Sequence, residues 1–296
     1  IFDHCSFSFC DYQAISMGGD WGALKNITIQ NCIFSENATG IIVGLDPNFP
    51  TGNMTSINNL FVDQGHRTPN VGGGLQYDII NNVFFNWGSR LINANSSSPE
   101  INFIGNYLQQ GDYTLEGSTN KVQSSSPTIY TANNYHSFYY PSPQLDDRNL
   151  WQNFYTNNNL SDNYFTTSMH PLMESPVILS ASETLSAVIS NVGANKHLNA
   201  DGTYSSYSDS FDIMKISNVT NNISTNPYNK NWTLPNIPNN TRPSNYDSDN
   251  DGMADTWEIN TYGDLTKSSN GDVDNDGYTN IEEFLNGVDS NIEDSN

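Results

Sequence analysis

Carboxylate side chains stand on alternate residues in two segments near the end of the chain, and this spacing suits a hard cation. Residues 247–258 read DSDNDGMADTWE, and residues 272–283 read DVDNDGYTNIEE. Each segment places acids at positions 1, 3 and 5 of a twelve-residue calcium loop, a glycine at position 6 for the sharp turn and a glutamate at position 12. Two full matches make calcium binding the strongest chemical prediction of this sequence.

The expected ligands in each loop are carboxylates and one backbone carbonyl, and the second loop adds one side-chain amide. In the first loop they are Asp247, Asp249, Asp251, the carbonyl of Met253, Asp255 and Glu258. In the second they are Asp272, Asp274, Asp276, the carbonyl of Tyr278, Asn280 and Glu283. Hard oxygen ligands in this number favour Ca²⁺ over Zn²⁺. No clear helix leads into the first loop, so we expect a structural or docking calcium module and not a switch.

The net charge of −22 is concentrated in this tail. Residues 247–296 hold fourteen of the 32 acidic residues and one of the ten basic residues. So acidic a chain argues against nucleic acid as a partner. No apolar run approaches the roughly 18 residues of a membrane span, so we expect no membrane segment. An anionic substrate would need a bound cation or a local cluster of arginines.

A repeat in the first half must position any such cluster. The similar segments FDHCSFSF, IQNCIFSE, INNLFVDQ, INNVFFNW, IGNYLQQG and ANNYHSFY align on Cys5, Cys32, Asn59, Asn82, Asn106 and Asn134, with spacings of 27, 27, 23, 24 and 28 residues. Repeats of this length indicate a solenoid or propeller. One short strand core and one asparagine in each unit favour an all-β, right-handed parallel β-helix, in which equivalent residues stack at the roughly 4.8 Å strand spacing. A β-sandwich is the alternative.

This register brings Arg67 and Arg90 together. They are 23 residues apart, which is also the local repeat length. The two side chains should therefore lie on neighbouring rungs and on the same face, where they repel unless an anion binds between them. Two solvated surface arginines are the alternative. By the same register, Cys5 and Cys32 should form a stack of buried thiols and not a disulfide.

We predict three regions: a β-helix catalytic domain over residues 1–140, a wrap and linker over 141–246 and tandem calcium loops over 247–288. Within the wrap, SASETLSAVISNVGAN predicts a short helix near residues 182–192, with Ser182 as its N-cap and Gly193 as its stop. The chain opens as IFDHCSFSFC, which is typical of a strand inside a fold. We therefore expect upstream sequence, including the signal peptide of a secreted protein.

The motifs of the first half also resemble a known family. IFDHCSFSFC, GHRTPN and INNVFFNWG, in this order, are similar to the pectate lyase family of right-handed β-helices over roughly residues 1–140. Residues 181–217 resemble, more weakly, the segment that follows such solenoids. The tail resembles the EF-hand-like or thrombospondin type 3-like calcium module that often follows them. The resemblance implies a monomeric enzyme whose partner is an acidic polysaccharide, pectate or a related polyuronate.

The resemblance implies β-elimination, in which a base removes the proton on C5 and the glycosidic oxygen leaves from C4. A cation must neutralise the uronate carboxylate, and a base must reach the proton. The arginine of the Arg-x-Pro motif, Arg67, is implied as that base. A free guanidinium has a pKa above about 12, so this role needs calcium and positive charge nearby. We assign Arg90 and His66 to substrate binding.

Calcium ligation at the solenoid is implied for Asp11, which follows the Ser-x-Ser motif. Asp3 fits a structural role better than ligation, and Asp20 is a further candidate ligand. The sequence departs from many members at Gly72, where they have a second arginine, at Thr39, where they have a lysine, and at Ile15. A reduced calcium site, another uronate substrate or an inactive β-helix therefore stay open.

Two other functions remain in view. The first is a non-catalytic β-helix that binds carbohydrate and has structural calcium only in its tail. The second is a hydrolase on the same fold, which requires paired carboxylates at a cleft. Asp3, Asp11, Asp20 and Asp63 would have to meet in space for that reaction. The pairing of Arg67 with Arg90 near Asp11 favours the lyase over the non-catalytic β-helix. No carboxylate pair stands out in the rungs, so the hydrolase ranks last.

Overall fold

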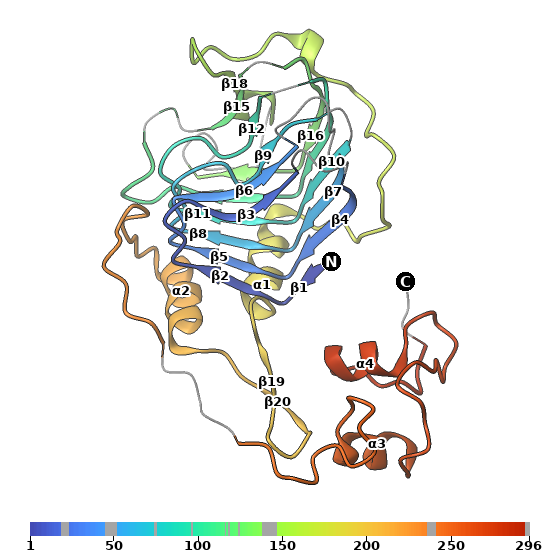
Figure 1. Ribbon diagram of the computed structural model, residues 1–296. Coiled ribbons are helices and arrows are strands. Elements are labelled where there is room, and N and C mark those ends of the chain that lie inside the picture. Colours follow the sequence, from blue (N-terminus) through green and yellow to red (C-terminus); the bar gives the residue numbers. More distant parts are fainter. Residues whose placement is uncertain are drawn as a thin grey trace. The chain divides into compact units, whose positions relative to one another are not determined.

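In the computed structural model the chain forms two compact units (Figure 1). The first comprises residues Ile1–Ala194 and Ser210–Leu234, and the second comprises Asn195–Asp209 and Pro235–Asn296. The structure describes residues 1–18, 24–44, 52–73, 76–95, 97–115, 117, 119–123, 125–137, 147–235 and 241–293.

The first unit is a parallel β-solenoid with three six-stranded sheets, confirming the predicted fold class. Sheet A contains β1 (Phe2–Asp3), β4 (Lys25–Gln30), β7 (Gly52–Ile57), β10 (Gln76–Ile80), β13 (Glu100–Ile104) and β16 (Thr128–Ala132). Sheet B contains β2 (Ser6–Ser8), β5 (Ile33–Ser35), β8 (Leu60–Val62), β11 (Val83–Phe85), β14 (Tyr107–Gln109) and β17 (Tyr135–His136). Sheet C contains β3 (Gln13–Met17), β6 (Thr39–Val43), β9 (Asn70–Val71), β12 (Asn93–Ala94), β15 (Asn120–Val122) and β18 (Trp151–Asn153).

Each rung takes one strand from each sheet in chain order, so strands of one sheet lie one repeat apart. The register pairs Phe34 with Phe7 and with Phe61, as the aligned segments predicted. Parallel pairing continues to Asn153, because β18 pairs with β15. The solenoid therefore extends beyond the predicted boundary at residue 140.

Stacked aromatic rings fill the interior of the solenoid. The rings of Phe7, Phe34, Phe61 and Phe84 follow one another at centroid distances of 4.8, 4.9 and 5.0 Å. These distances match the strand spacing, so each rung adds one ring to the stack. The core is therefore continuous along the axis of the solenoid.

An asparagine ladder supports the corner between sheets A and B. The side-chain oxygens of Asn59, Asn82, Asn106 and Asn134 each accept a hydrogen bond from the backbone N–H of the equivalent residue on the preceding rung, at 2.9–3.0 Å. The column continues through sulfur, because the N–H of Cys5 lies 3.4 Å from Sγ of Cys32. Both thiols are free, as predicted.

Two helices follow in the chain (Figure 1). Apolar side chains of both pack against those of sheet B. Helix α1 (Ala181–Ser190) is close to the predicted helix, but Ser180 and not Ser182 is its N-cap, because the capping box joins Ser180 to Glu183. Helix α2 (Ser210–Asn221) was not predicted. Two short 3₁₀ turns flank β18: η1 (Asp147–Leu150) directly precedes it, and η2 (Asp162–Tyr164) follows it.

The second unit contains an antiparallel pair, β19 (Lys196–Leu198) and β20 (Tyr204–Ser206), and two helices, α3 (Asp255–Tyr262) and α4 (Asn280–Asn286). Its small core includes Trp257 and Phe284, whose ring centroids are 5.2 Å apart. None of the helices in the described residues is long and apolar enough to cross a membrane.

Candidate functional site

Arg67 lies in the connection between β8 and β9, at a corner where the backbone is fixed from both sides. Its N–H donates to the carbonyl of Arg90 at 3.0 Å, and its own carbonyl accepts from the N–H of Ile41 at 3.0 Å. Its φ of 60° is in the left-handed region, which a non-glycine residue adopts at a cost. The neighbouring rungs therefore hold Arg67 in one backbone position.

Arg67 and Arg90 occupy consecutive rungs, as the spacing predicted. Both are half-buried, and the Nε atoms of both are buried without a hydrogen-bond partner among the described residues. The guanidinium carbon of Arg90 lies 5.1 Å from the centroid of the Phe154 ring, which supports it by a cation–π contact. Burial and repulsion by Arg67 lower the pKa of Arg90, while Tyr228 acts in the opposite direction. Among the described residues, no acid forms an ion pair with either arginine of this corner.

His66 completes this group. Its Nε2 lies 3.3 Å from the hydroxyl of Thr39 on the preceding rung. Burial, then Arg90 and Arg67, lowers the pKa of His66 to about 4. The imidazole is therefore neutral at neutral pH, and it can hydrogen-bond a ligand without adding a third positive charge.

Asp11 has a different environment from the one predicted for a calcium ligand. It is exposed and forms an ion pair with Lys230. Backbone hydrogen bonds join Ala38 to Cys10 on the preceding rung, and join Gly65 on the next rung to Asn37. Asp11 therefore lies two rungs from His66, which is about 10 Å at the usual strand spacing. Within the described parts of the chain, Asp11 belongs to none of the groups of three acidic or histidine ligands that suit a metal.

Two other acids considered for the solenoid, Asp3 and Asp63, have hydrogen-bond or ion-pair partners within the protein. Asp3 accepts from Nδ1 of His4 at 2.8 Å and from Nδ2 of Asn31 at 3.0 Å, which is a structural role. Asp63 is fully buried and bound to Lys215. Asp20 lies outside the described residues. Asp63 does not supply a carboxylate for the catalytic pair of a hydrolase, because Lys215 already compensates its charge.

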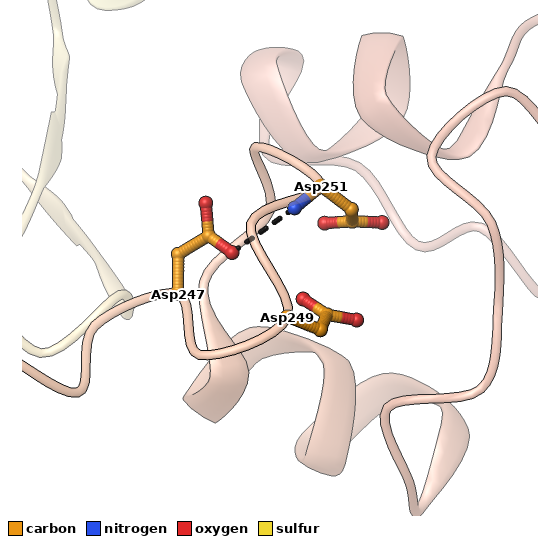
Figure 2. Close-up of side chains that lie close together, drawn as sticks. All are labelled: Asp247, Asp249 and Asp251. Atoms are coloured by element: carbon orange, nitrogen blue, oxygen red, sulfur yellow. Dashed lines mark hydrogen bonds between the residues drawn. The ribbon is translucent and has the colours of Figure 1, made fainter.

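The first acidic loop, residues 247–258, brings its three alternate aspartates together. Figure 2 shows Asp247, Asp249 and Asp251 around the loop, with the side chain of Asp247 accepting from the backbone N–H of Asp251. Ligand atoms of these three acids lie within 4.8 Å of one another. Gly252 has a φ of 102°, which explains the glycine at the sharp turn. The loop is thus already folded around a potential cation position.

Glu258 closes the first loop from α3. It is 0% exposed, and neither carboxylate oxygen has a hydrogen-bond partner among the described residues. Burial and the neighbouring acids, above all Asp251, raise the pKa of Glu258 to about 7. Asp249 and Asp255 offer oxygens to the same position. An isolated buried carboxylate is costly, so its orientation toward further acids fits a bound cation.

Two predicted ligands of the first loop have additional structural roles. The side chain of Met253 is fully buried in the core of the second unit, so only its carbonyl is available for ligation. Asp255 accepts from the N–H and the hydroxyl of Ser248, both at 2.7 Å. A cation would share the Asp255 carboxylate with these donors.

The second loop repeats the arrangement. Ligand atoms of Asp272, Asp274 and Asp276 lie within 4.8 Å of one another. Asn280 is buried, and its Oδ1 has no hydrogen-bond partner among the described residues, which leaves a hard oxygen available for a cation. Glu283 is also buried on α4, whereas the side chain of Tyr278 is exposed, as expected if only its carbonyl is used.

Sequence reasoning missed the residues that reach the arginine corner from far along the chain. Phe154 lies under Arg90, Tyr228 donates to the carbonyl of Gly65 at 3.2 Å, and Lys230 holds Asp11. Tyr228 and Lys230 come from a segment outside the repeat, and Phe154 follows β18, beyond the aligned segments of the sequence, so the spacing related none of them to Arg67. An exposed aromatic or lysine in such a segment gives no signal of its own.

Comparison with known proteins leaves the family open. No family model matches the chain, and no curated protein matches it. The structure thus supports a β-solenoid with acidic groups that can hold a cation such as calcium.

Proposed function

We propose that the protein is a polysaccharide lyase that cleaves pectate or a related polyuronate by calcium-assisted β-elimination. The observation that carries this proposal is the pair formed by Arg67 and Arg90 on consecutive rungs, with their Nε atoms buried and unpartnered. Stacked like charges are unfavourable in a scaffold, and a carboxylate between them would offset the repulsion. A polyuronate presents one such carboxylate on every sugar ring.

The reaction divides between the two arginines and His66. Arg90 binds the uronate carboxylate, which withdraws electron density and acidifies the proton on C5. Arg67 is the candidate base: its neutral guanidine form, reached by loss of a proton to solvent, has a nitrogen lone pair that takes the C5 proton. The C5–H electron pair becomes the C4–C5 double bond, and the glycosidic oxygen leaves C4 with its own pair and is protonated by water. His66, neutral and bonded to Thr39, orients a sugar hydroxyl.

Asp11 fits the calcium role only as one ligand of a shared site. Calcium takes six to eight oxygen ligands, and one exposed carboxylate paired with Lys230 supplies at most two of them. The remaining ligands would be substrate carboxylates and water. A calcium ion bound there would neutralise a uronate carboxylate and further acidify the C5 proton.

Replacing the candidate base tests the proposal. The change Arg67→Ala should lower the rate of product formation from polygalacturonate by about 10²-fold or more, the usual contribution of a positioned base. The product is followed by the ultraviolet absorbance of its new double bond. Arg148→Ala is the matched control, because Arg148 forms an ion pair with Asp162 at the surface. Unchanged turnover in Arg67→Ala would remove Arg67 from the mechanism.

A non-catalytic carbohydrate-binding solenoid is the second candidate. The ion pair between Asp11 and Lys230 favours it, because it occupies the implied calcium ligand. This alternative predicts retention of the unmodified protein in a pectate-containing gel with no unsaturated product. The lyase predicts both retention and product.

We further propose that the two acidic loops bind calcium as a structural module. Two observations support this: the buried carboxylate of Glu258 lies with those of Asp249 and Asp255, and Asp272, Asp274 and Asp276 cluster in the second loop.

A further inference from the structure

A segment that follows α2 crosses the solenoid beside the arginine corner. We call residues 222–234 the strap. Near its start, the hydroxyl of Ser224 accepts from the N–H of Asp112 at 2.9 Å. Toward its end, Trp232 packs against Phe9 at a ring-centroid distance of 5.5 Å, and Lys230 pairs with Asp11. The strap thus runs from the rung of Asp112 back to the first rung, past the rungs of Arg90 and Arg67.

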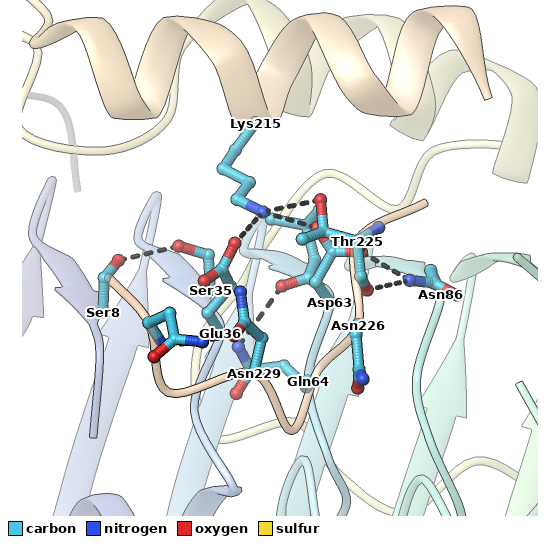
Figure 3. A network of polar contacts seen from close by, with 12 residues as sticks. Ser8, Ser35, Glu36, Asp63, Gln64, Asn86, Lys215, Thr225, Asn226 and Asn229 are labelled. Atoms are coloured by element: carbon cyan, nitrogen blue, oxygen red, sulfur yellow. Dashed lines mark hydrogen bonds and ion pairs between the residues drawn. The ribbon is translucent and has the colours of Figure 1, made fainter. Parts of the chain in front are cut away.

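Lys215 on α2 fixes the start of the strap to the solenoid (Figure 3). Its fully buried ammonium lies 2.6 Å from Oε1 of Glu36 and 2.7 Å from Oδ2 of Asp63, acids on consecutive rungs. It also donates to the hydroxyl of Thr225 in the strap at 3.3 Å. The other Asp63 oxygen accepts from the N–H of Thr225 at 3.0 Å, so α2, strap and solenoid share one network.

This anchoring places Tyr228 against the corner that carries the arginines. Its ring touches Gly65 and Gly88, which stand two residues before Arg67 and Arg90. A Cβ atom at Gly65 would lie 2.9 Å from the ring, and one at Gly88 would lie 2.6 Å from the hydroxyl oxygen. At Gly88 the tyrosine hydroxyl is the nearest obstacle to a side chain, whereas at Gly65 the carbonyl oxygen of Ala38 already excludes one.

Tyr228 is held firmly but is not buried. Its hydroxyl donates to the carbonyl of Gly65 at 3.2 Å, while 48% of the residue remains exposed. A tyrosine that only filled space would bury its ring, as Tyr77 does at 0% exposure in the core. An oriented and accessible aromatic surface beside paired cations suits a sugar, whose C–H groups pack on the ring while its carboxylate meets the arginines.

We propose that Tyr228 is a substrate-binding residue, on which the strap presents an aromatic platform for one acidic pyranose ring whose carboxylate pairs with Arg90. This inference rests on the proposed function and adds a contact from outside the solenoid repeat. The same contacts make the platform rigid, so binding would not require the strap to move. Its contribution is to affinity, because the ring does not touch the reacting atoms.

Steady-state kinetics on polygalacturonate test this role. Tyr228→Leu keeps most of the side-chain volume but removes the aromatic face, and it should raise KM about tenfold with kcat changed less than about twofold. Tyr228→Phe keeps the face and should stay within about twofold of the unmodified protein in KM. Tyr130→Ala, which alters a half-buried tyrosine on sheet A, is the control.

Retention in pectate-containing gels and thermal unfolding complete the test. Weaker retention of Tyr228→Leu with a Tm within about 2 °C of the unmodified protein supports a direct contact. Unchanged KM and retention for Tyr228→Leu would overturn the inference while leaving the lyase intact. Equal losses in Tyr228→Leu and Tyr228→Phe would also overturn it, because the hydroxyl and not the aromatic face would then matter. If the unmodified protein neither binds nor cleaves pectate, the proposed function itself fails.

Discussion

At the scale of single residues, two groups of charged side chains in the solenoid differ in whether opposite charges lie beside them. Lys215 lies between Glu36 and Asp63, so its charge is more than compensated. No acid in the described residues forms an ion pair with Arg67 or Arg90. Electrostatic stability would have favoured an acid beside them as well. The difference is understandable if the missing negative charge belongs to a ligand.

Removing the lysine tests how much the fold depends on this compensation. Lys215→Met should destabilise the protein by about 3–5 kcal/mol, because it leaves two buried carboxylates facing each other without a cation. Urea unfolding followed by circular dichroism measures the change. Lys25→Met is the control, since Lys25 is exposed at the start of β4. Adding Glu36→Gln and Asp63→Asn to Lys215→Met should recover part of the loss, and an undiminished loss would show that packing and not charge is responsible.

At the scale of elements, the corner between sheets A and B is the most uniform part of the solenoid. Two residues separate the sheet A strand from the sheet B strand at every rung, as in β7 and β8 or β10 and β11. The first of these residues is in the left-handed region at Asn58 and Asn81, with φ of 55° and 52°. The second is a ladder asparagine in the last four rungs and a cysteine in the first two. This division of roles explains the recurrent Asn-Asn pair in the sequence.

The ladder should be expensive to interrupt. Asn82→Ala removes an acceptor for the N–H of Asn59 and donors to the carbonyls of Ser56 and Ile80. At about 1 kcal/mol for each lost bond, and more for each buried group left unsatisfied, we expect a loss of about 3 kcal/mol or more. Urea unfolding measures it, with Asn158→Ala at an exposed position as the control. Similar stabilities for the two variants would contradict the ladder's role.

The elements also show what the sequence could predict. Equivalent residues of successive repeats stack on one another in a solenoid. The spacing of the repeats in the sequence therefore predicted the sheets, the asparagine ladder and the pairing of Arg67 with Arg90. Helix α2 did not, because its apolar pattern does not indicate which face is buried. Ile213 and Met214 are exposed, while Asp212 and Lys215 are buried through contacts with distant rungs. The strap was missed for the same reason, since nothing local identifies its partners.

At the scale of the whole molecule, the two units differ in what holds them together. The solenoid has a continuous core and ladder, whereas the second unit has a small core and two clusters of acids. Mutual repulsion within these clusters opposes folding unless a cation is bound. We therefore expect calcium to stabilise one unit selectively.

Scanning calorimetry with calcium or with a chelator checks this expectation. At 100 times its dissociation constant, a ligand adds about 2.7 kcal/mol, which should raise the Tm of so small a unit by about 10 °C or more. Glu258→Gln should reduce this shift, and Asp264→Asn, outside the two loops, should not. The solenoid transition should stay where it is. A chelator that leaves both transitions unchanged would rule out calcium as the stabilising ion.

The fixed corner between sheets A and B has a consequence for how such a protein can diversify. That corner has two residues at every rung, whereas the connection from sheet B to sheet C varies in length. It has three residues between β5 and β6, seven between β8 and β9 and fourteen between β17 and β18. Insertions at the variable corner leave the ladder and core register intact, and Arg67 and Arg90 stand at this corner. Recognition can therefore evolve, or be engineered, by exchanging loops there as interchangeable modules on a constant frame.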